Sequence, residues 1–306
     1  MRLASLSVDL DALRHYFRIH GLAAPPDDPG APDPVYILGA SRFGELASRL
    51  GARGTVFCVG QELGRPGARE AVRALADDGH EIANHSWSHD YRLWRRGPAQ
   101  AAEEIRRGGE AVAEAAGRPA RGFRAPGYAL SPAMLAALVD QGYRYDSSAF
   151  PAAPYWLAKA VVLAALRLAG RRSAAVLDRP RALLAPRVPY RPSRDEPYAR
   201  GDLPIWELPV LTGLAGFPLV GTVAATLPGS ALRLLAAGTR RRPLLVLELH
   251  GLDLLDASES PAPLTAARPD LRAPAARKMD RLLAFARALG RDWATLEEAA
   301  AHLGPC

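Results

Sequence analysis

The chain has 306 residues, of which 49% are hydrophobic, and it carries a net charge of +7 with an isoelectric point near 9.8. This composition excludes an intrinsically disordered chain, and no run of about 20 uninterrupted apolar residues predicts a membrane-spanning helix. Cys58 and Cys306 lie far apart and indicate neither a disulfide framework nor a paired-cysteine metal site. We therefore expect a globular protein from a reducing compartment.

The N-terminal sequence MRLASLSVDLDAL reaches two acidic residues by position 11 and lacks an apolar stretch of signal-peptide length, which predicts a cytoplasmic protein. The excess positive charge is local, because residues 155–200 carry ten basic side chains against three acidic ones. A localised basic segment indicates an anionic partner or surface. The charge is balanced elsewhere, so we do not expect nucleic acid as a partner.

Short apolar runs alternate with helix-like stretches along most of the chain. The runs that predict strands are 2–8, 54–60, 80–85, 122–126, 205–210 and 243–250. The stretches that predict helices are 66–79, 99–117 and 131–142. This alternation favours a parallel α/β architecture, in which functional side chains gather at the C-terminal ends of the strands.

Residues 151–242 depart from the alternation, because proline and arginine clusters interrupt their apolar stretches. We interpret the chain as one domain, 1–306, with an insertion at about 151–242. Within it, residues 155–172 and 230–242 both combine an apolar body with basic residues. In one interpretation these segments lie on an anionic membrane surface, and in the other they pack on the rest of the protein with solvated arginines.

The motif HEIANHSWSHD places His85 and His89 four residues apart. On a helical turn both imidazoles would face one metal ion, although an isolated pair with this spacing is more often part of an exposed loop. Ser86 stands where a zinc peptidase motif has its glutamate, which disfavours a peptidase. A catalytic site with two histidines needs one carboxylate as a third ligand and an open position for water.

The motif SVDLDAL supplies two candidate carboxylates. Asp9 and Asp11 would point to the same side at the end of a strand, where one can bind a metal and the other can accept a proton. In the alternative interpretation, Asp11 caps a helix that follows.

Six motifs occur in an order that resembles the polysaccharide deacetylase family, also called NodB-type or family-four carbohydrate esterases. They are SVDLD, GTVFCVGQEL, HEIANHSWSHD, GFRAPGY, YDSSAFP and VLELHG. The resemblance covers about residues 1–150 and 243–300. It implies a distorted (β/α) barrel, a divalent metal that is usually zinc, and hydrolysis of N-acetyl groups on amino sugars.

Matched by position, the resemblance implies metal ligands and catalytic side chains. The implied metal ligands are Asp11, His85 and His89. The implied catalytic residues are Asp9 as the base, Arg124 as the arginine that steadies it, and His250 as the general acid.

One departure from the family pattern leaves open which of the two aspartates is the base and which is the metal ligand. The family's common form has adjacent aspartates followed by glycine, whereas here Leu10 separates Asp9 from Asp11 and Ala12 follows. The roles of base and ligand could therefore be reversed.

Chemistry suggests further contacts. A backbone N–H near Gly127 or Tyr128 would stabilise the oxyanion, with glycine allowing a close approach. Trp87 and Tyr128 would line a sugar-stacking surface or, in the alternative, form simple walls of the site. His250 would protonate the departing amine, and Arg124 would keep Asp9 ionised.

We therefore expect a zinc-dependent carbohydrate N-deacetylase that acts on an amino sugar. The basic and apolar insertion adds the hypothesis of a lipid-linked substrate reached at the inner face of a membrane. Two alternatives stay open: a deformylase or another non-peptide C–N hydrolase with the same site, and a glycan-binding protein without catalysis.

Overall fold

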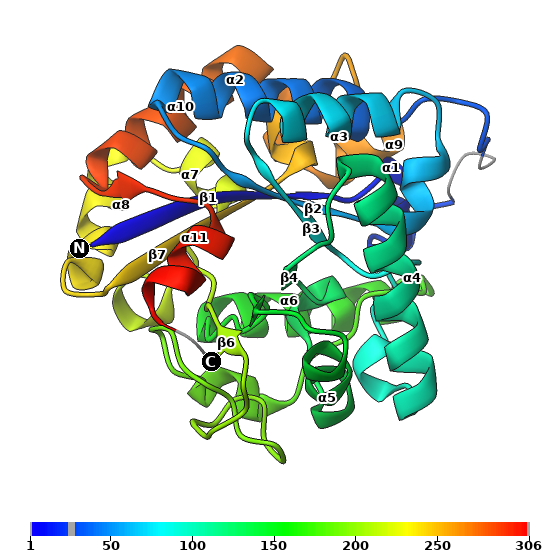
Figure 1. Cartoon of the computed structure of the whole chain (residues 1–306). Helices are drawn as coiled ribbons and strands as arrows, with labels where there is room; N and C mark the ends of the chain where they lie inside the picture. Colours follow the sequence, from blue (N-terminus) through cyan, green and yellow to red (C-terminus); the bar gives the residue numbers. More distant parts are fainter. Residues whose placement is uncertain (1, 24–27, 305–306) are drawn as a thin grey trace.

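The structure is a computed structural model that describes residues 2–23 and 28–304, so Cys306 lies outside the described residues. Its strands form one parallel sheet in the order β6-β5-β4-β3-β2-β1-β7, with β8 pairing beside β1 (Figure 1). The strands are β1 (Leu3–Leu10), β2 (Thr55–Cys58), β3 (Glu81–Asn84), β4 (Gly122–Phe123), β5 (Tyr145–Asp146), β6 (Trp206–Glu207), β7 (Leu244–His250) and β8 (Asp292–Trp293).

The two ends of this strand order meet. Just after β6, Val210 forms a parallel bridge with Val246 of β7, and the N–H of Leu211 donates to the Val246 carbonyl at 3.0 Å. Because β7 pairs with β1 at its other edge, the sheet curls into a barrel. The expected distorted (β/α) barrel is confirmed.

Helices surround the sheet. The α-helices of the described residues are α1 (Leu13–Ile19), α2 (Ala40–Leu50), α3 (Ala68–Asp77), α4 (Pro98–Ala116), α5 (Pro132–Asp140), α6 (Ala153–Leu168), α7 (Gly221–Thr226), α8 (Gly229–Ala236), α9 (Ala262–Ala267), α10 (Ala275–Ala288) and α11 (Leu296–His302). Figure 1 shows α2, α3 and α10 as an outer layer over β1 and β2.

Local sequence explains where the expected helices begin. At α5, Ser131 Oγ accepts the N–H of Met134 at 3.3 Å, and Pro132 occupies the first helical position. Proline also begins α4, at Pro98. All six predicted strands and all three predicted helices are present, with bounds that differ by up to three residues at either end. The helices α2 and α10 and the two-residue strands β5 and β8 were not predicted.

The central strand is buried on both faces. All eight residues of β1 are buried, as expected for a strand covered by helices outside and by the barrel interior within. Phe43 and Leu46 of α2 and Leu282 of α10 belong to the same buried cluster as the β1 residues Leu6 and Val8. This packing fixes the end of β1, from which Asp9 and Asp11 emerge.

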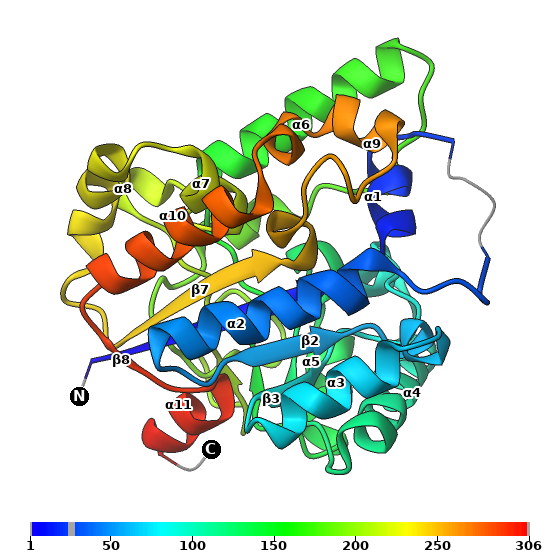
Figure 2. The same ribbon diagram turned by 90° about the horizontal axis from the view of Figure 1, so that it is seen from above.

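The two basic and apolar segments of the insertion differ in how they pack. Helix α8 buries Leu232 and packs Leu235 against the core. Helix α6 buries none of its residues, and its Leu157 and Val161 side chains are 59% and 69% exposed. Figure 2 shows α6 along the outer edge of the molecule. Of the two segments, 230–242 therefore packs on the barrel, whereas α6 presents apolar side chains outward.

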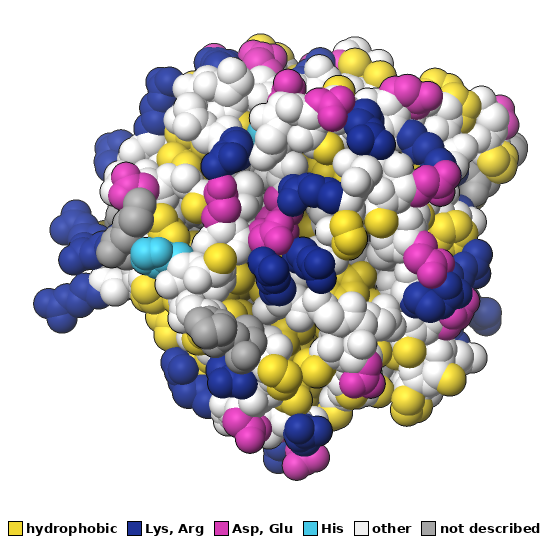
Figure 3. Space-filling view, in the orientation of Figure 1, with side chains coloured by type: hydrophobic (Ala, Val, Ile, Leu, Met, Phe, Trp, Pro, Cys, Tyr) yellow, Lys and Arg dark blue, Asp and Glu magenta, His cyan; other side chains and the backbone are white. Residues whose placement is uncertain are grey.

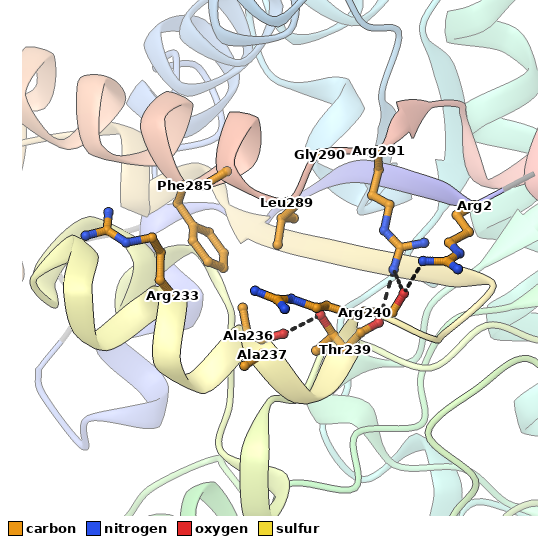
Figure 4. A pocket seen from close by; sticks show the side chains of 11 residues that line it. Arg2, Arg233, Ala236, Ala237, Thr239, Arg240, Phe285, Leu289, Gly290 and Arg291 are labelled. Atoms are coloured by element: carbon orange, nitrogen blue, oxygen red, sulfur yellow. Dashed lines mark hydrogen bonds between the residues drawn. The ribbon is translucent and has the colours of Figure 1, made fainter.

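Arginines fix the turn that follows α8 (Figure 4). Arg291 donates to the carbonyls of Thr239, Arg240 and Arg242 at 2.9–3.1 Å, and Arg2 donates to the Arg240 carbonyl at 3.0 Å. These guanidinium groups bind carbonyls at the end of a helix, where the helix dipole favours a positive charge. Arginine has a structural role here.

Basic and acidic side chains are interspersed over the face shown in Figure 3, rather than gathered by sign. In the part of the chain that the structure describes, no helix meets the length and apolarity needed to cross a bilayer.

Candidate active site

A cavity of about 290 Å³ lies at the C-terminal ends of the strands, and Asp9, Asp11, His85 and His250 line it. The parallel register brings them together, because Asp9 of β1 pairs with His250 of β7 on one side and with Phe57 of β2 on the other. His85 follows β3, the next strand beyond β2. Residues far apart in sequence thus share one edge of the sheet.

Asp11, His85 and His89 form a buried group whose ligand atoms lie within 4.8 Å of one another. Asp11 Oδ1 is 3.3 Å from His85 Nε2 and 3.1 Å from His89 Nε2. Asp11 Oδ1 and both ring nitrogens of His89 are buried without a hydrogen-bond partner among the described residues. Buried polar atoms that converge without hydrogen bonds are the arrangement expected around a cation. Two imidazoles and one carboxylate therefore fit a divalent metal.

The loop after β3 holds the two imidazoles. His85 Nδ1 lies 2.7 Å from the Arg124 carbonyl, to which it donates as N–H, and this leaves Nε2 to face Asp11. Ser86 and His89 have positive φ angles of 66° and 56°, and Ser86 Oγ accepts the His89 N–H at 3.1 Å. The expectation of a helical turn is wrong here. A strained loop, rather than a helix, brings the rings together.

The helix-cap interpretation of Asp11 is also wrong. Helix α1 begins at Leu13 after the N-cap residue Ala12, whose side chain makes no capping hydrogen bond. The Leu13 N–H instead donates to Asp33 Oδ2 at 2.9 Å. The Asp11 carboxylate is thus left to face the histidines.

Asp9 pairs with Arg124 inside the barrel. The Arg124 side chain is fully buried, and its Nη1 lies 2.6 Å from Asp9 Oδ1. It also donates to the hydroxyls of Ser7 and Ser147 and, at 2.8 Å, to the Ser147 carbonyl. Burial raises the pKa of Asp9, and the Arg124 charge only partly offsets this. Arg124 therefore holds one oxygen of Asp9, and Oδ2 faces His85 at 3.9 Å.

His250 pairs with Glu248, a residue that sequence reasoning missed. Glu248 Oε1 lies 2.9 Å from His250 Nδ1 and accepts the Tyr128 hydroxyl at 3.0 Å. Burial alone would lower the pKa of His250, but Glu248, Asp11 and Asp9 together outweigh it and raise the pKa to about 10. The sequence did contain a signal for Glu248, because side chains two residues apart on a strand, such as those at positions 248 and 250, face the same way.

Asp9, Glu248 and His250 also offer ligand atoms within 4.8 Å of one another. Unlike Asp11 and His89, Asp9 and Glu248 already have close cationic partners, in Arg124 and His250. We therefore interpret this second group as acid–base machinery rather than as another metal site.

Of the three residues predicted to contact the substrate, two line the cavity and one does not. Gly127 and Tyr128 line the cavity at positive φ angles of 67° and 69°. The Tyr128 N–H already donates to the Ala125 carbonyl at 3.1 Å, so it is engaged within its own turn. Trp87 does not line this cavity, and the Arg107 guanidinium stacks over its ring at 4.2 Å. The cavity thus gives no support to Trp87 as a sugar platform.

Beneath His89, His15 and Glu62 form a pair that was not predicted. The His15 and His89 ring centroids are 4.5 Å apart, and His15 Nε2 lies 3.1 Å from Glu62 Oε1. Burial would raise the pKa of Glu62, but His15, Arg65 and Arg14 together lower it to about 2. This network buttresses the ring of His89.

Helix α6 supplies one wall of the cavity, which sequence reasoning did not anticipate. Its lining residues are Tyr155, Ala158, Lys159, Val162 and Leu163. The insertion therefore contributes to the site.

The fold and the site define an α/β barrel with a candidate divalent-cation site at the C-terminal ends of its strands. The family model described as polysaccharide deacetylase matches residues 41–145. The match includes His85, His89 and Arg124 and ends before His250. The resemblance to polysaccharide deacetylases drawn from the sequence motifs is thus confirmed.

Solved structures share this fold over almost the whole chain. A protein from Mycobacterium smegmatis assigned as a polysaccharide deacetylase is 19% identical, with a TM-score of 0.59 over 98% of this chain and 89% of that one. One from Pseudomonas aeruginosa with the same assignment is 17% identical, with a TM-score of 0.59 over 98% and 90%. A family-four pseudoenzyme from Bacillus anthracis is 8% identical, with a TM-score of 0.50 over 98% and 65%. No curated protein matches the sequence.

Proposed function

We propose that this protein is a metal-dependent hydrolase that removes an N-acetyl group from an amino sugar. The observation that carries the proposal is the convergence of buried, unpartnered atoms of Asp11 and His89 with His85 at the mouth of the barrel. The family match across the histidine loop supports the carbohydrate as the class of substrate.

Zinc is the ion that we propose for this site. It accepts two imidazoles and one carboxylate and keeps a further position open in catalytic sites. When bound, such an ion lowers the pKa of water and polarises the amide carbonyl.

Asp9 accepts the proton of the attacking water in this proposal. Arg124 orients the carboxylate through Oδ1, and the other oxygen, Oδ2, is directed toward His85 and the metal site. The proposal thus keeps Asp9 as the base and Asp11 as the ligand.

His250 donates a proton to the departing amine, which is otherwise a poor leaving group. Glu248 keeps the imidazole protonated and oriented, and Tyr128 fixes Glu248 in turn. Because the Tyr128 N–H is engaged, we assign the Gly127 N–H as the backbone donor to the oxyanion.

A deacylation assay tests the proposal, with a panel of N-acetyl and N-formyl amino sugars in free, polymeric and lipid-linked form. We expect turnover that a chelator abolishes and zinc restores. Preference for N-formyl substrates would favour the deformylase alternative. Binding of sugars without turnover, whichever divalent metal is added, would favour the glycan-binding alternative. A pseudoenzyme with the same fold is among the similar structures.

Metal content separates the two aspartates. We expect Asp9→Asn to keep the ion and lose turnover, and Asp11→Asn to lose the ion. The reverse result would exchange their roles while leaving the proposed reaction in place.

We further propose that α6 brings a cytoplasmic enzyme to the inner face of a membrane, where it acts on a lipid-linked amino sugar. Leu157 and Val161 are exposed on α6, and Arg167 and Arg172 follow near its C-terminal end. An apolar face with a basic end suits an anionic lipid surface.

Vesicle sedimentation tests the membrane proposal with phosphatidylglycerol and phosphatidylcholine vesicles. We expect salt-sensitive binding to the anionic vesicles that is lost in Leu157→Asp/Val161→Asp. The matched control is Leu234→Asp on α8, a leucine that is 67% exposed and that should not affect binding. Equal binding by all three proteins, or no binding by the unaltered chain, would refute the membrane proposal.

A further inference from the structure

The cavity contains one cationic side chain that the proposed mechanism does not use. Lys159 of α6 lines the same cavity as Asp9, Asp11 and His250. A Cβ atom built on Gly127 would stand 3.9 Å from its Nζ, which places the ammonium opposite the turn proposed to bind the oxyanion. Lys159 is thus within the reaction chamber rather than on the outer face of α6.

The Lys159 ammonium lacks a close counter-ion. Among the residues that the structure describes, it has no hydrogen bond or ion pair, and its Nζ lies 5.8 Å from the centroid of the Tyr155 ring. Asp178 is the acidic residue whose charge acts on Lys159. Its carboxylate, however, accepts hydrogen bonds from the Tyr198 hydroxyl and the Arg179 N–H. Both oxygens of Asp178 are therefore engaged.

Lys159 is half-buried, and this makes the isolation of its charge costly. Burial lowers the pKa of Lys159 to about 8, so the side chain is still protonated at neutral pH by roughly ten to one. A partly desolvated ammonium with three free donors gains most when an anion enters the cavity beside it.

The surroundings of Lys159 are apolar. Ala158, Val162 and Leu163 of α6 and Ile19 of α1 line the same cavity. His20 also lines it, and its buried Nε2 has no partner among the described residues. The ligand that fits combines the acylated amino group at the metal end, an anionic group at Lys159 and an apolar portion along α6.

We propose that Lys159 forms an anion-binding subsite and that the substrate is an N-acyl amino sugar carrying an anionic group, such as a phosphate ester, on the side that faces α6. The inference rests on the proposed function and adds the charge of the substrate to it. A sugar phosphate and the headgroup of a glycolipid phosphate present the same chemistry to the ammonium.

Kinetics on a matched pair of substrates tests the subsite: N-acetylglucosamine and N-acetylglucosamine 1-phosphate. We expect Lys159→Met to lower kcat/KM for the phosphate by about tenfold or more, mostly through KM, and to lower it much less for the neutral sugar. Lys159→Arg should retain part of the preference. Arg167→Met, which removes one positive charge from the exposed side of the same helix, is the control and should retain all of it.

Binding gives a second readout that does not depend on turnover. Isothermal titration of the chelator-treated full chain with the same two sugars should show tighter binding of the phosphate, and Lys159→Met should abolish the difference. Circular dichroism checks that the variants are folded. An equal loss on both sugars, or no preference for the phosphate in the unaltered chain, would overturn the subsite.

A third ligand distinguishes the two sources of the anion. Tighter binding of the octyl phosphodiester of N-acetylglucosamine than of the monoester would support the subsite and assign it to a lipid-linked substrate. Equal binding of the two, both dependent on Lys159, would support it for a soluble sugar phosphate. Deacylation of both the neutral and the phosphorylated sugar without any effect of Lys159→Met would overturn the subsite and leave the proposed function intact.

Discussion

Arg124→Met tests how the barrel interior tolerates the Asp9 carboxylate. Among the residues that the structure describes, Asp9 forms ion pairs with Arg124 and His85, and Arg124 binds it at 2.6 Å in a fully buried position. Removing one member of a buried pair leaves an uncompensated charge and costs about 3–5 kcal/mol. Methionine fills much of the arginine volume, so the loss reports mainly on charge and hydrogen bonding.

A double-mutant cycle separates the two contributions. In Arg124→Met/Asp9→Asn the buried charge is absent, and we expect a recovery of about 2 kcal/mol or more in the free energy of unfolding. The remainder reflects the lost hydrogen bonds to Ser7 and Ser147. Urea unfolding of the chelator-treated proteins measures all four corners of the cycle.

The pH dependence of the single variant provides an independent check. Burial already raises the pKa of Asp9, and loss of Arg124 raises it further. A carboxyl whose pKa is raised by folding loses its stabilising contribution as the pH rises from about 4 through its folded-state pKa. The deficit of Arg124→Met should therefore shrink as the pH falls. A cost below about 1 kcal/mol, or no recovery in the double variant, would refute the reasoning.

Other outcomes can be checked with purified variants. His89→Ala should lose most of its zinc in metal analysis, whereas Asp9→Asn should retain it; retention by both would contradict the assigned ligand set. His250→Ala should slow hydrolysis of N-acetyl amides more than of p-nitrophenyl acetate, because the activated ester has a better leaving group; equal losses would argue against a general acid. Gly108→Ala places a Cβ only 2.7 Å from the Ser86 carbonyl carbon, so the loop that carries His85 and His89 must shift and zinc affinity should fall. Unchanged zinc affinity and stability would contradict this expectation.

The sequence predicted the parts of the site that obey local rules. Strand ends are readable from apolar runs, and parallel strands bring their C-terminal ends together, so Asp9, His85 and His250 were expected at one edge. The period of a strand also placed Asp9 and Asp11 near each other. These inferences needed no knowledge of long-range packing.

Other features depend on the tertiary structure and were missed. Nothing in the local sequence around Glu62 or Lys159 indicates that distant elements bring them to His89 and to the catalytic cavity. The positive φ angles at Ser86 and His89 were also not readable, because neither residue is glycine.

The placement of α6 has a consequence for how this protein can change over evolutionary time. Its side chains line the cavity, yet none of them is buried in the core, and the chain beyond it is held at Ile19 and His20 by Ser173 and Arg171. Substitutions on α6 can therefore alter which molecules enter the cavity without opening voids in the barrel. Selection can thus tune substrate range on α6 while the barrel and its proposed metal site stay constant.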